Sequence, residues 1–284
     1  MEGSLRDLYG VLEQLKYINH LGEEIDFGRD GMYVNENDLH NFSWSVQSTN
    51  NRISGFTRGI QTKNVPVRIA CTSKVDGIVK RNRLFEVPER DVLAMEHGRL
   101  IVNGYYCECF VTASKKARYS ISEQYMAVDL TITTDRPAWV KETEIEVKAD
   151  SEWRPESDTG LDFSFDFPFD FNPSTDRISY LTNESFYDTN FRLDIHGAVL
   201  NPTVFINEHE YQVNTNVMNG QVLTIDSVAK TIYLDDENVF DARLRDSYIF
   251  QPISSGELSI RWDNTFDFDL YLLEERSEPR WVLS

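Results

Sequence analysis

Leu-Ile-Val-Asn-Gly-Tyr-Tyr-Cys-Glu-Cys-Phe-Val-Thr, residues 100–112, is the clearest local structural signal in the chain. Apolar residues flank Asn103-Gly104 on both sides, as in two strands joined by a two-residue turn. A type I′ turn requires positive φ at both central residues, and Asn and Gly tolerate that conformation. We therefore predict a β-hairpin here, and an antiparallel β structure for the sequence around it.

Three further segments in the first half alternate apolar with polar or small residues, the pattern of a strand with one face toward a core. Pro66 lies in the second of these segments and has no N–H to donate to a ladder, so we expect an edge strand there. The expected core-facing positions are Phe42, Trp44 and Val46; Val65, Val67, Ile69 and Cys71; and Met126, Val128, Leu130 and Ile132.

Two helices are expected in the first half. Ser4 is placed to cap a short amphipathic helix, and Asp7 suits the positive end of its dipole. A second helix is expected between Pro88, which suits a first helical turn, and Gly98, which suits the left-handed residue after a last turn. The apolar positions of the first helix are Leu8, Val11, Leu12 and Leu15.

The length of 284 residues favours two compact domains. Residues 141–160 are polar and acidic, so we place the boundary there, between a β-rich domain of residues 1–142 and a second domain of residues 143–284. Short strand-like runs separated by turn residues predict an antiparallel β-sandwich in the second domain. These runs are 162–171, 191–196, 203–206, 210–213, 221–226, 231–234, 247–253, 256–262 and 266–274.

The net charge of −19 is unevenly distributed, with −1 in residues 1–142 and −18 in residues 143–284. This balance argues against nucleic-acid binding, which works through clustered Lys and Arg. No apolar run approaches the roughly 20 residues that span a bilayer, and residues 1–20 lack the pattern of a secretory signal. We expect a protein made in a cytoplasm, with no membrane partner.

The sequence contains no recognisable catalytic or metal-binding motif. The five histidines lack metal-ligand spacing, and no nucleophile elbow, phosphate loop or dinucleotide motif is present. Three cysteines cannot form an even disulfide framework, so we expect free thiols at Cys71, Cys107 and Cys109. We therefore expect no catalytic residue, no metal and no cofactor, and a protein that is not an enzyme.

Asp162-Phe163-Ser164-Phe165-Asp166-Phe167-Pro168-Phe169-Asp170-Phe171 is the most unusual segment. Its aspartates are four residues apart, about 13 Å along a strand, which is too far for one calcium ion. We interpret the segment as an aromatic row facing a core with a solvated acidic face. The acidic cluster Asp235-Asp236-Glu237 is interpreted as a solvated loop, since no glycine-centred ligand pattern surrounds it.

Two basic segments lie in the near-neutral half, Lys80-Arg81-Asn82-Arg83 and Lys115-Lys116-Ala117-Arg118. Such segments are usually solvated turns. In an assembly they can instead meet carboxylates of a neighbouring subunit, since complementary charges guide association. The sequence leaves both interpretations open.

A carbohydrate-binding module that contacts cell-surface polysaccharide is an alternative function, because indole faces stack on sugar rings and the second half is acidic. Trp153 and Trp262 are the candidate stacking residues. Trp262 shares its parity with Leu258 and Ile260, however, which indicates burial. A hydrolase that uses a pair of carboxylates has no distinguishing spacing to support it.

Several segments, in order, resemble the distal tail proteins (Dit family) of long-tailed phages. The first-half segments are Phe42-Ser43-Trp44-Ser45, 82–87, Asp91-Val92, 98–106 and 137–142, and the second-half segments are 166–171, 190–193, Asn201-Pro202-Thr203, Ile225-Asp226-Ser227 and 275–281. The resemblance implies a belt domain that closes a hexameric ring, followed by a galectin-like β-sandwich.

This resemblance also implies a function. The ring is expected to join the tail-tube protein to the tail-tip hub or tail-associated lysin, leaving a channel for DNA. The protein is then a structural component of the virion tail tip, made in the host cytoplasm. The family pattern carries over no catalytic or metal residues, and it leaves the role of residues 1–16 open.

Overall fold

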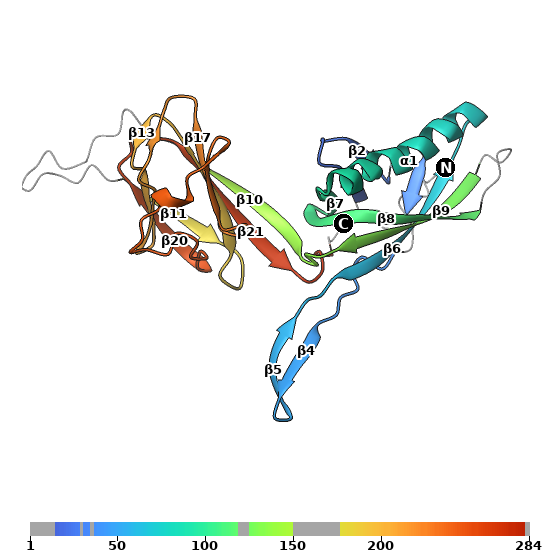
Figure 1. Ribbon diagram of the computed structural model, residues 1–284, viewed down its shortest axis with the longest axis horizontal. Coiled ribbons are helices and arrows are strands. Elements are labelled where there is room, and N and C mark those ends of the chain that lie inside the picture. The colour runs from blue at the N-terminus through green and yellow to red at the C-terminus, as the bar shows by residue number, and fades with distance from the viewer. Residues whose placement is uncertain (1–14, 29–30, 35–36, 119–124, 150–176, 282–284) are drawn as a thin grey trace, which may run out of the picture. The chain divides into compact units, whose positions relative to one another are not determined.

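The computed structural model describes residues 15–28, 31–34, 37–118, 125–149 and 177–281 (Figure 1). The chain divides into two compact units, Met1–Lys141 with Glu275–Ser284 (unit 1) and Glu142–Glu274 (unit 2). The structure is mainly β with antiparallel pairing, which confirms the predicted fold class. Among the described helices, none has both the length and the apolar character needed to cross a membrane.

Along the sequence, unit 1 has strands before and after one long helix. Its main sheet runs in the order β2, β1, β7, β8, and continues from β8 through β9 and β6 to β3, while β4 and β5 pair only with each other. The elements are β1 (Leu15–Ile18), β2 (Glu24–Asp26), β3 (Met32–Val34), β4 (Ser45–Thr49), β5 (Arg52–Thr57), β6 (Gln61–Ala70), α1 (Lys74–Ala94), β7 (Gly98–Val102), β8 (Tyr105–Arg118), β9 (Tyr125–Thr134) and the start of β10 (Trp139–Val147).

The predicted hairpin is confirmed as β7 and β8, with Val102 opposite Tyr105. Asn103 and Gly104 have φ of 51° and 81°, the two positive values that this turn requires. The alternating positions of β6 and β9 are buried as predicted, and they form one core with Leu84 and Val87 of α1.

The prediction of an edge strand at Pro66 is wrong. β6 lies between β3 and β9, so it has neighbours on both sides. β3 is short, however, and its pairing with β6 ends at Val67. Among the described residues, Pro66 therefore has a strand partner only on the β9 side, opposite Asp129, and the missing N–H is tolerated.

The second predicted helix exists as α1, but both predicted ends are wrong. The helix begins after Ser73, whose hydroxyl accepts a hydrogen bond from the N–H of Asp76 at 3.1 Å. It ends at Met95, which has the left-handed φ of 58° expected for Gly98. Pro88 lies inside the helix and Gly98 begins β7. The first predicted helix lies outside the described residues.

Unit 2 is an antiparallel sandwich. One sheet runs β19, β18, β17, β12, β21, β10, the other runs β11, β20, β14, β15, and both supply one core. The elements are the rest of β10, β11 (Arg177–Asn183), β12 (Asn190–His196), β13 (Val199–Leu200), β14 (Thr203–Ile206), β15 (His209–Gln212), β16 (Asn216–Val217), β17 (Val222–Asp226), β18 (Thr231–Leu234), β19 (Glu237–Asn238), the 3-10 helix η2 (Phe240–Ala242), β20 (Gly256–Trp262) and β21 (Phe268–Arg276).

Most predicted strand runs of the second half correspond to strands of this sandwich. The run 247–253 does not, because its apolar residues Ile249, Phe250 and Ile253 are buried from a turn-rich segment. Ile253 makes only an isolated bridge with Thr189. The pattern therefore marked burial and not a strand. The run 162–171 lies outside the described residues.

Candidate assembly surfaces

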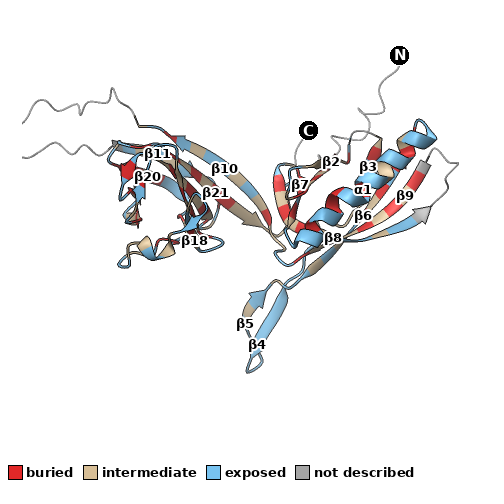
Figure 2. Ribbon diagram, turned by 45° about the horizontal axis from the view of Figure 1, so that its top comes forward, coloured by how far each residue is buried: buried red, intermediate tan, exposed pale blue. Residues whose placement is uncertain are grey.

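The β4–β5 hairpin is the most exposed regular element of unit 1 (Figures 1 and 2). None of the residues of β4 and β5 is buried. Asn50 and Asn51 form its turn with φ of 53° and 58°. Because an isolated two-stranded hairpin is only marginally stable in water, an element of this kind is expected to have a partner.

One face of this hairpin is apolar. Val46 lies directly opposite Phe56, and Trp44 packs edge-on against Phe56 with ring centroids 6.5 Å apart. The register shifts between Gln47 and Ser48, so Ser48 lies opposite Ile53. We call this surface, formed by Trp44, Val46, Ile53 and Phe56, the apolar hairpin face.

The register shift is a β-bulge, and it adds Ile53 to the apolar hairpin face. Without the register shift, Ser48 would lie opposite Ser54, and Ile53 would point to the other face with Thr49. With the shift, Ile53 joins Val46 and Phe56 on one side, while Ser45, Gln47 and Thr57 lie on the other. The result is an amphipathic hairpin.

The expectation that Phe42, Trp44 and Val46 face a core is wrong. Their exposed fractions are 51%, 42% and 57%. The alternation predicted the strand correctly for β4 but not what its apolar side would face, because β4 and β5 pair only with each other and the buried core of unit 1 does not include these side chains. An exposed apolar patch of this kind is typical of an interaction site.

The base of the hairpin is held firmly. Lys63 donates to the backbone oxygens of Asp38 and Asn41, and the N–H of Asn64 donates to the Asp38 carboxylate at 2.7 Å. The guanidinium of Arg58 lies over the ring of Trp44 at 4.2 Å and donates to the carbonyl of Pro137. These contacts fix the root of the hairpin while its apolar face stays open.

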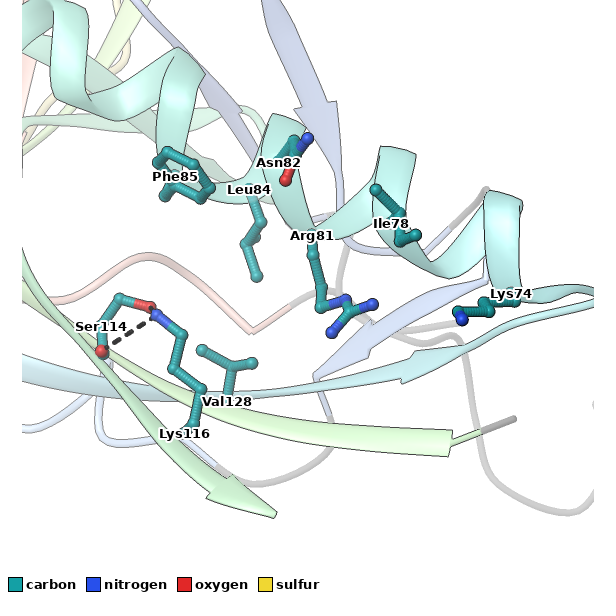
Figure 3. Close-up of a pocket in the computed structure, with 9 residues that line it drawn as sticks. All are labelled: Lys74, Ile78, Arg81, Asn82, Leu84, Phe85, Ser114, Lys116 and Val128. Atoms are coloured by element: carbon teal, nitrogen blue, oxygen red, sulfur yellow. Dashed lines mark hydrogen bonds between the residues drawn. The ribbon is translucent and has the colours of Figure 1, made fainter. Parts of the chain in front are cut away.

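A groove lies between α1 and the sheet (Figure 3). Its volume is about 470 Å³, and Ile78, Leu84 and Phe85 of α1 face Val128 of β9 across it. A smaller space of about 220 Å³ shares Leu84 and Phe85 and continues along the helix. The two spaces adjoin at Leu84, Phe85 and Ser114, and we call them together the α1 groove.

The two basic segments of the sequence meet at the α1 groove. Neither is a turn, because Lys80–Arg83 belongs to α1 and Lys115–Arg118 to β8. Arg81 and Lys116 both line the groove. Lys116 bonds only to Ser114, at 3.0 Å to its hydroxyl, and has no carboxylate partner among the described residues (Figure 3).

Of the two candidate sugar-stacking residues, the structure describes only Trp262. Trp262 is 2% exposed, and its ring packs edge-on against Phe268 at 5.5 Å, so the burial indicated by its parity is confirmed. A ring in this position has no face open to a sugar. Trp153 lies outside the described residues.

The other chemical candidates have structural roles. The exposed Asp235 carboxylate accepts hydrogen bonds from the N–H of Val222 and the amide of Gln221, and so holds a turn. Cys71, Cys107 and Cys109 are buried free thiols, and burial raises the pKa of Cys107 to about 11. Within the described part of the chain, His, Cys, Asp and Glu form no group placed to hold a metal ion.

Comparison of the whole fold with solved structures identifies similar chains in phage adsorption machinery. The chain of the phage SPP1 Dit protein (gp 19.1) matches with a TM-score of 0.55 and 9% identity, over 94% of this chain and 100% of that one. This chain shares the Dit fold. The resemblance drawn from the ordered segments is thereby confirmed for the fold.

A chain of the phage p2 baseplate, in its activated conformation, has the same fold. The calcium-bound and strontium-bound structures match with TM-scores of 0.59 and 0.60, each at 9% identity and over 95% of this chain and 100% of the other. No protein-family model and no curated protein matches the sequence. The likeness to these chains is therefore one of fold, at 9% sequence identity.

Proposed function

We propose that this protein is a structural component of a phage tail tip. Six copies form a ring that joins the tail-tube protein to the tail-tip hub or tail-associated lysin and leaves a channel for DNA. The protein is made in the host cytoplasm and is carried in the virion. The Dit fold over nearly the whole chain supports this role, as does the similarity to a baseplate chain.

The apolar hairpin face is the single observation in the structure that best supports assembly. A closed ring requires a contact between two different surfaces of neighbouring copies. The hairpin offers one of them, because Val46, Ile53 and Phe56 are each more than half exposed. Covering these side chains removes apolar area from water at about 25 cal/mol per Å², which favours association.

Light scattering and negative-stain microscopy of the purified chain test the proposal. The mass is expected to be a multiple of 33.0 kDa, with six-fold rings in the images. A chain that stays monomeric at high concentration, and also with tail-tube or hub protein present, would contradict it.

A matched pair of variants tests the hairpin itself. Val46→Lys with Phe56→Lys places two charges on the apolar face, at directly opposed positions, and is expected to abolish the ring. Ser45→Lys with Thr57→Lys places the same charges on the polar face of the same hairpin and is expected to leave it intact. Equal loss in both variants would argue against a specific role of the apolar face.

A further inference from the structure

The α1 groove is long and runs beside an open strand edge. Residues from Lys74 to Val92 of α1 line it, a distance of roughly 27 Å at 1.5 Å per residue. Beyond Cys109, β8 pairs only with β9, so in the described structure its other edge carries no strand. An edge of this kind can accept an added strand.

The lining of the groove locates it at that edge. The four consecutive residues Val111, Thr112, Ala113 and Ser114 of β8 all contribute to it. The register of the β8–β9 pairing shifts between Val111 and Ala113, so side chains do not alternate strictly along this part of β8. Residues Val111–Ser114 lie beyond Cys109, where the edge of β8 opposite β9 carries no strand in the described structure, so an extended chain in the groove would lie beside that edge.

The groove combines an apolar floor with a basic end. Ile78, Phe85 and Val92 are 40%, 43% and 39% exposed along one side of α1. Lys74, Arg81 and Lys116 line the end near the start of the helix, and Glu89 lines the other end. Lys74 and Lys116 form no ion pair with a carboxylate in the part of the chain that the structure describes. An occupant that fits must offer both apolar side chains and carboxylates.

We propose that the α1 groove binds the segment Asp162–Phe171 of a second copy of this chain as an extended strand. This inference rests on the proposed self-assembly and names a second contact within it. The segment places five phenylalanines on one side of an extended chain and three aspartates on the other. The rings fill the apolar floor, and the long side chains of Lys74 and Lys116 reach the carboxylates at the rim.

Length and charge agree with this occupant. Ten residues in an extended conformation span about 30 Å, close to the length of the groove. The groove lies in the half of the sequence with a net charge of −1 and the segment in the half with −18, so this pairing brings cations to the acidic half.

Binding of a synthetic peptide of residues 161–172 tests the pairing directly. The receptor is the full chain carrying Phe165→Ala, Phe167→Ala and Phe169→Ala, so that its own segment does not compete. Fluorescence anisotropy is expected to show saturable binding that weakens with added salt. Absence of saturable binding would overturn the proposal.

Variants in the groove identify the binding site. Phe85→Asp is expected to weaken peptide binding at least about tenfold, since buried aromatic anchors dominate such interfaces. Lys116→Glu, at an exposed position, is expected to weaken it several-fold and to flatten the salt dependence. Leu93→Asp is the control, because Leu93 is 79% exposed on the same helix and does not line the groove. Unchanged affinity in both groove variants would overturn the proposal.

A photo-crosslinking residue in place of Phe85 tests whether the occupant comes from another copy. In a mixture of isotopically light and heavy chains, crosslinks between light and heavy are expected to map to residues 162–171. Crosslinks that stay within one chain, or that map elsewhere, would contradict a contact between copies.

These results separate the inference from the proposed function. If six-fold rings form without these crosslinks, the proposed groove contact is wrong and the proposed function still stands. The opposite result is that the peptide binds and the crosslinks form, but the chain never forms rings with tail-tube or hub protein. In that case the proposed tail-tip ring is wrong and the groove contact still stands.

Discussion

Asp91 is a fully buried carboxylate that ties α1 to the start of the sheet in unit 1. One oxygen accepts a hydrogen bond from the hydroxyl of Tyr17 at 2.5 Å, and the other accepts from the backbone N–H of His20 at 2.9 Å and contacts its ring nitrogen at 2.5 Å. Gly98 is needed beside them, because a Cβ there would overlap Tyr17 and Asp91. The glycine thus serves close packing and not a helix end.

Replacing Asp91 tests how much these hydrogen bonds contribute to the stability of the fold. Asp91→Ala leaves the Tyr17 hydroxyl and the His20 N–H buried without their acceptor, and is expected to lower the free energy of unfolding by about 3 kcal/mol. Asp91→Asn keeps an acceptor oxygen and is expected to cost less. Chemical denaturation followed by circular dichroism measures both, and equal stability of wild type and the alanine variant would contradict this role.

Tyr17 makes the stability of unit 1 depend on pH in the alkaline range. Burial, and then the hydrogen bond to Asp91, raise the pKa of its hydroxyl well above the usual value of about 10. The folded state therefore holds this proton more tightly than the unfolded state. The resulting stability is complete below about pH 10 and is lost as the pH rises further.

Alkaline titration followed by phenolate absorbance measures this effect. Tyr17 is expected to ionise only together with unfolding. In Tyr17→Phe, one tyrosine fewer should titrate in that cooperative step. Ionisation of Tyr17 in the folded protein near pH 10 would contradict the assignment.

At the scale of secondary-structure elements, the extent of α1 and the register of the β4–β5 hairpin can be predicted from the sequence only in part. Pro88 removes one helical hydrogen bond from α1, yet the helix continues to Ala94 because Leu84, Val87 and Asp91 are buried against the sheet. The bulge at Gln47 and Ser48 similarly depends on the pairing that β5 makes. In α1, tertiary contacts override local preference, whereas in the hairpin the pairing of the two strands sets the register.

The start of α1 depends on the Ser73 cap. Ser73→Ala removes the acceptor for the N–H of Asp76 and is expected to cost about 1 kcal/mol of helix stability. Ser73→Asp restores an acceptor and suits the helix dipole, so it should retain most of the wild-type protection. Hydrogen exchange of the first-turn amides of α1 compares them, and equal protection in Ser73→Ala and wild type would argue against the cap.

At the scale of the whole molecule, the charge of −19 governs solubility. The calculated isoelectric point is 4.6, so repulsion between molecules vanishes near this pH. We expect a minimum of solubility close to pH 4.6, with recovery on either side. Turbidity measured across a pH series checks this, and a minimum near neutral pH would contradict it.

Features that depend on a few consecutive residues could be predicted from the amino-acid sequence. The β7–β8 turn follows from the φ tolerance of Asn103-Gly104, and the buried rows of β6 and β9 follow from side-chain alternation. Most strands of the sandwich follow in the same way. The difference in net charge between residues 1–142 and residues 143–284 also follows from the sequence alone.

The covering of apolar rows and the contacts between distant residues depend on how the whole chain packs. Alternation cannot tell that Val46 and Phe56 face solvent while Val65 and Val67 face a core, because burial depends on partners far along the chain. Residues 275–281 return to unit 1, where Trp281 stacks on His40 at 3.9 Å. The α1 groove likewise exists only once the helix lies beside β8, since its two walls are separate segments of sequence.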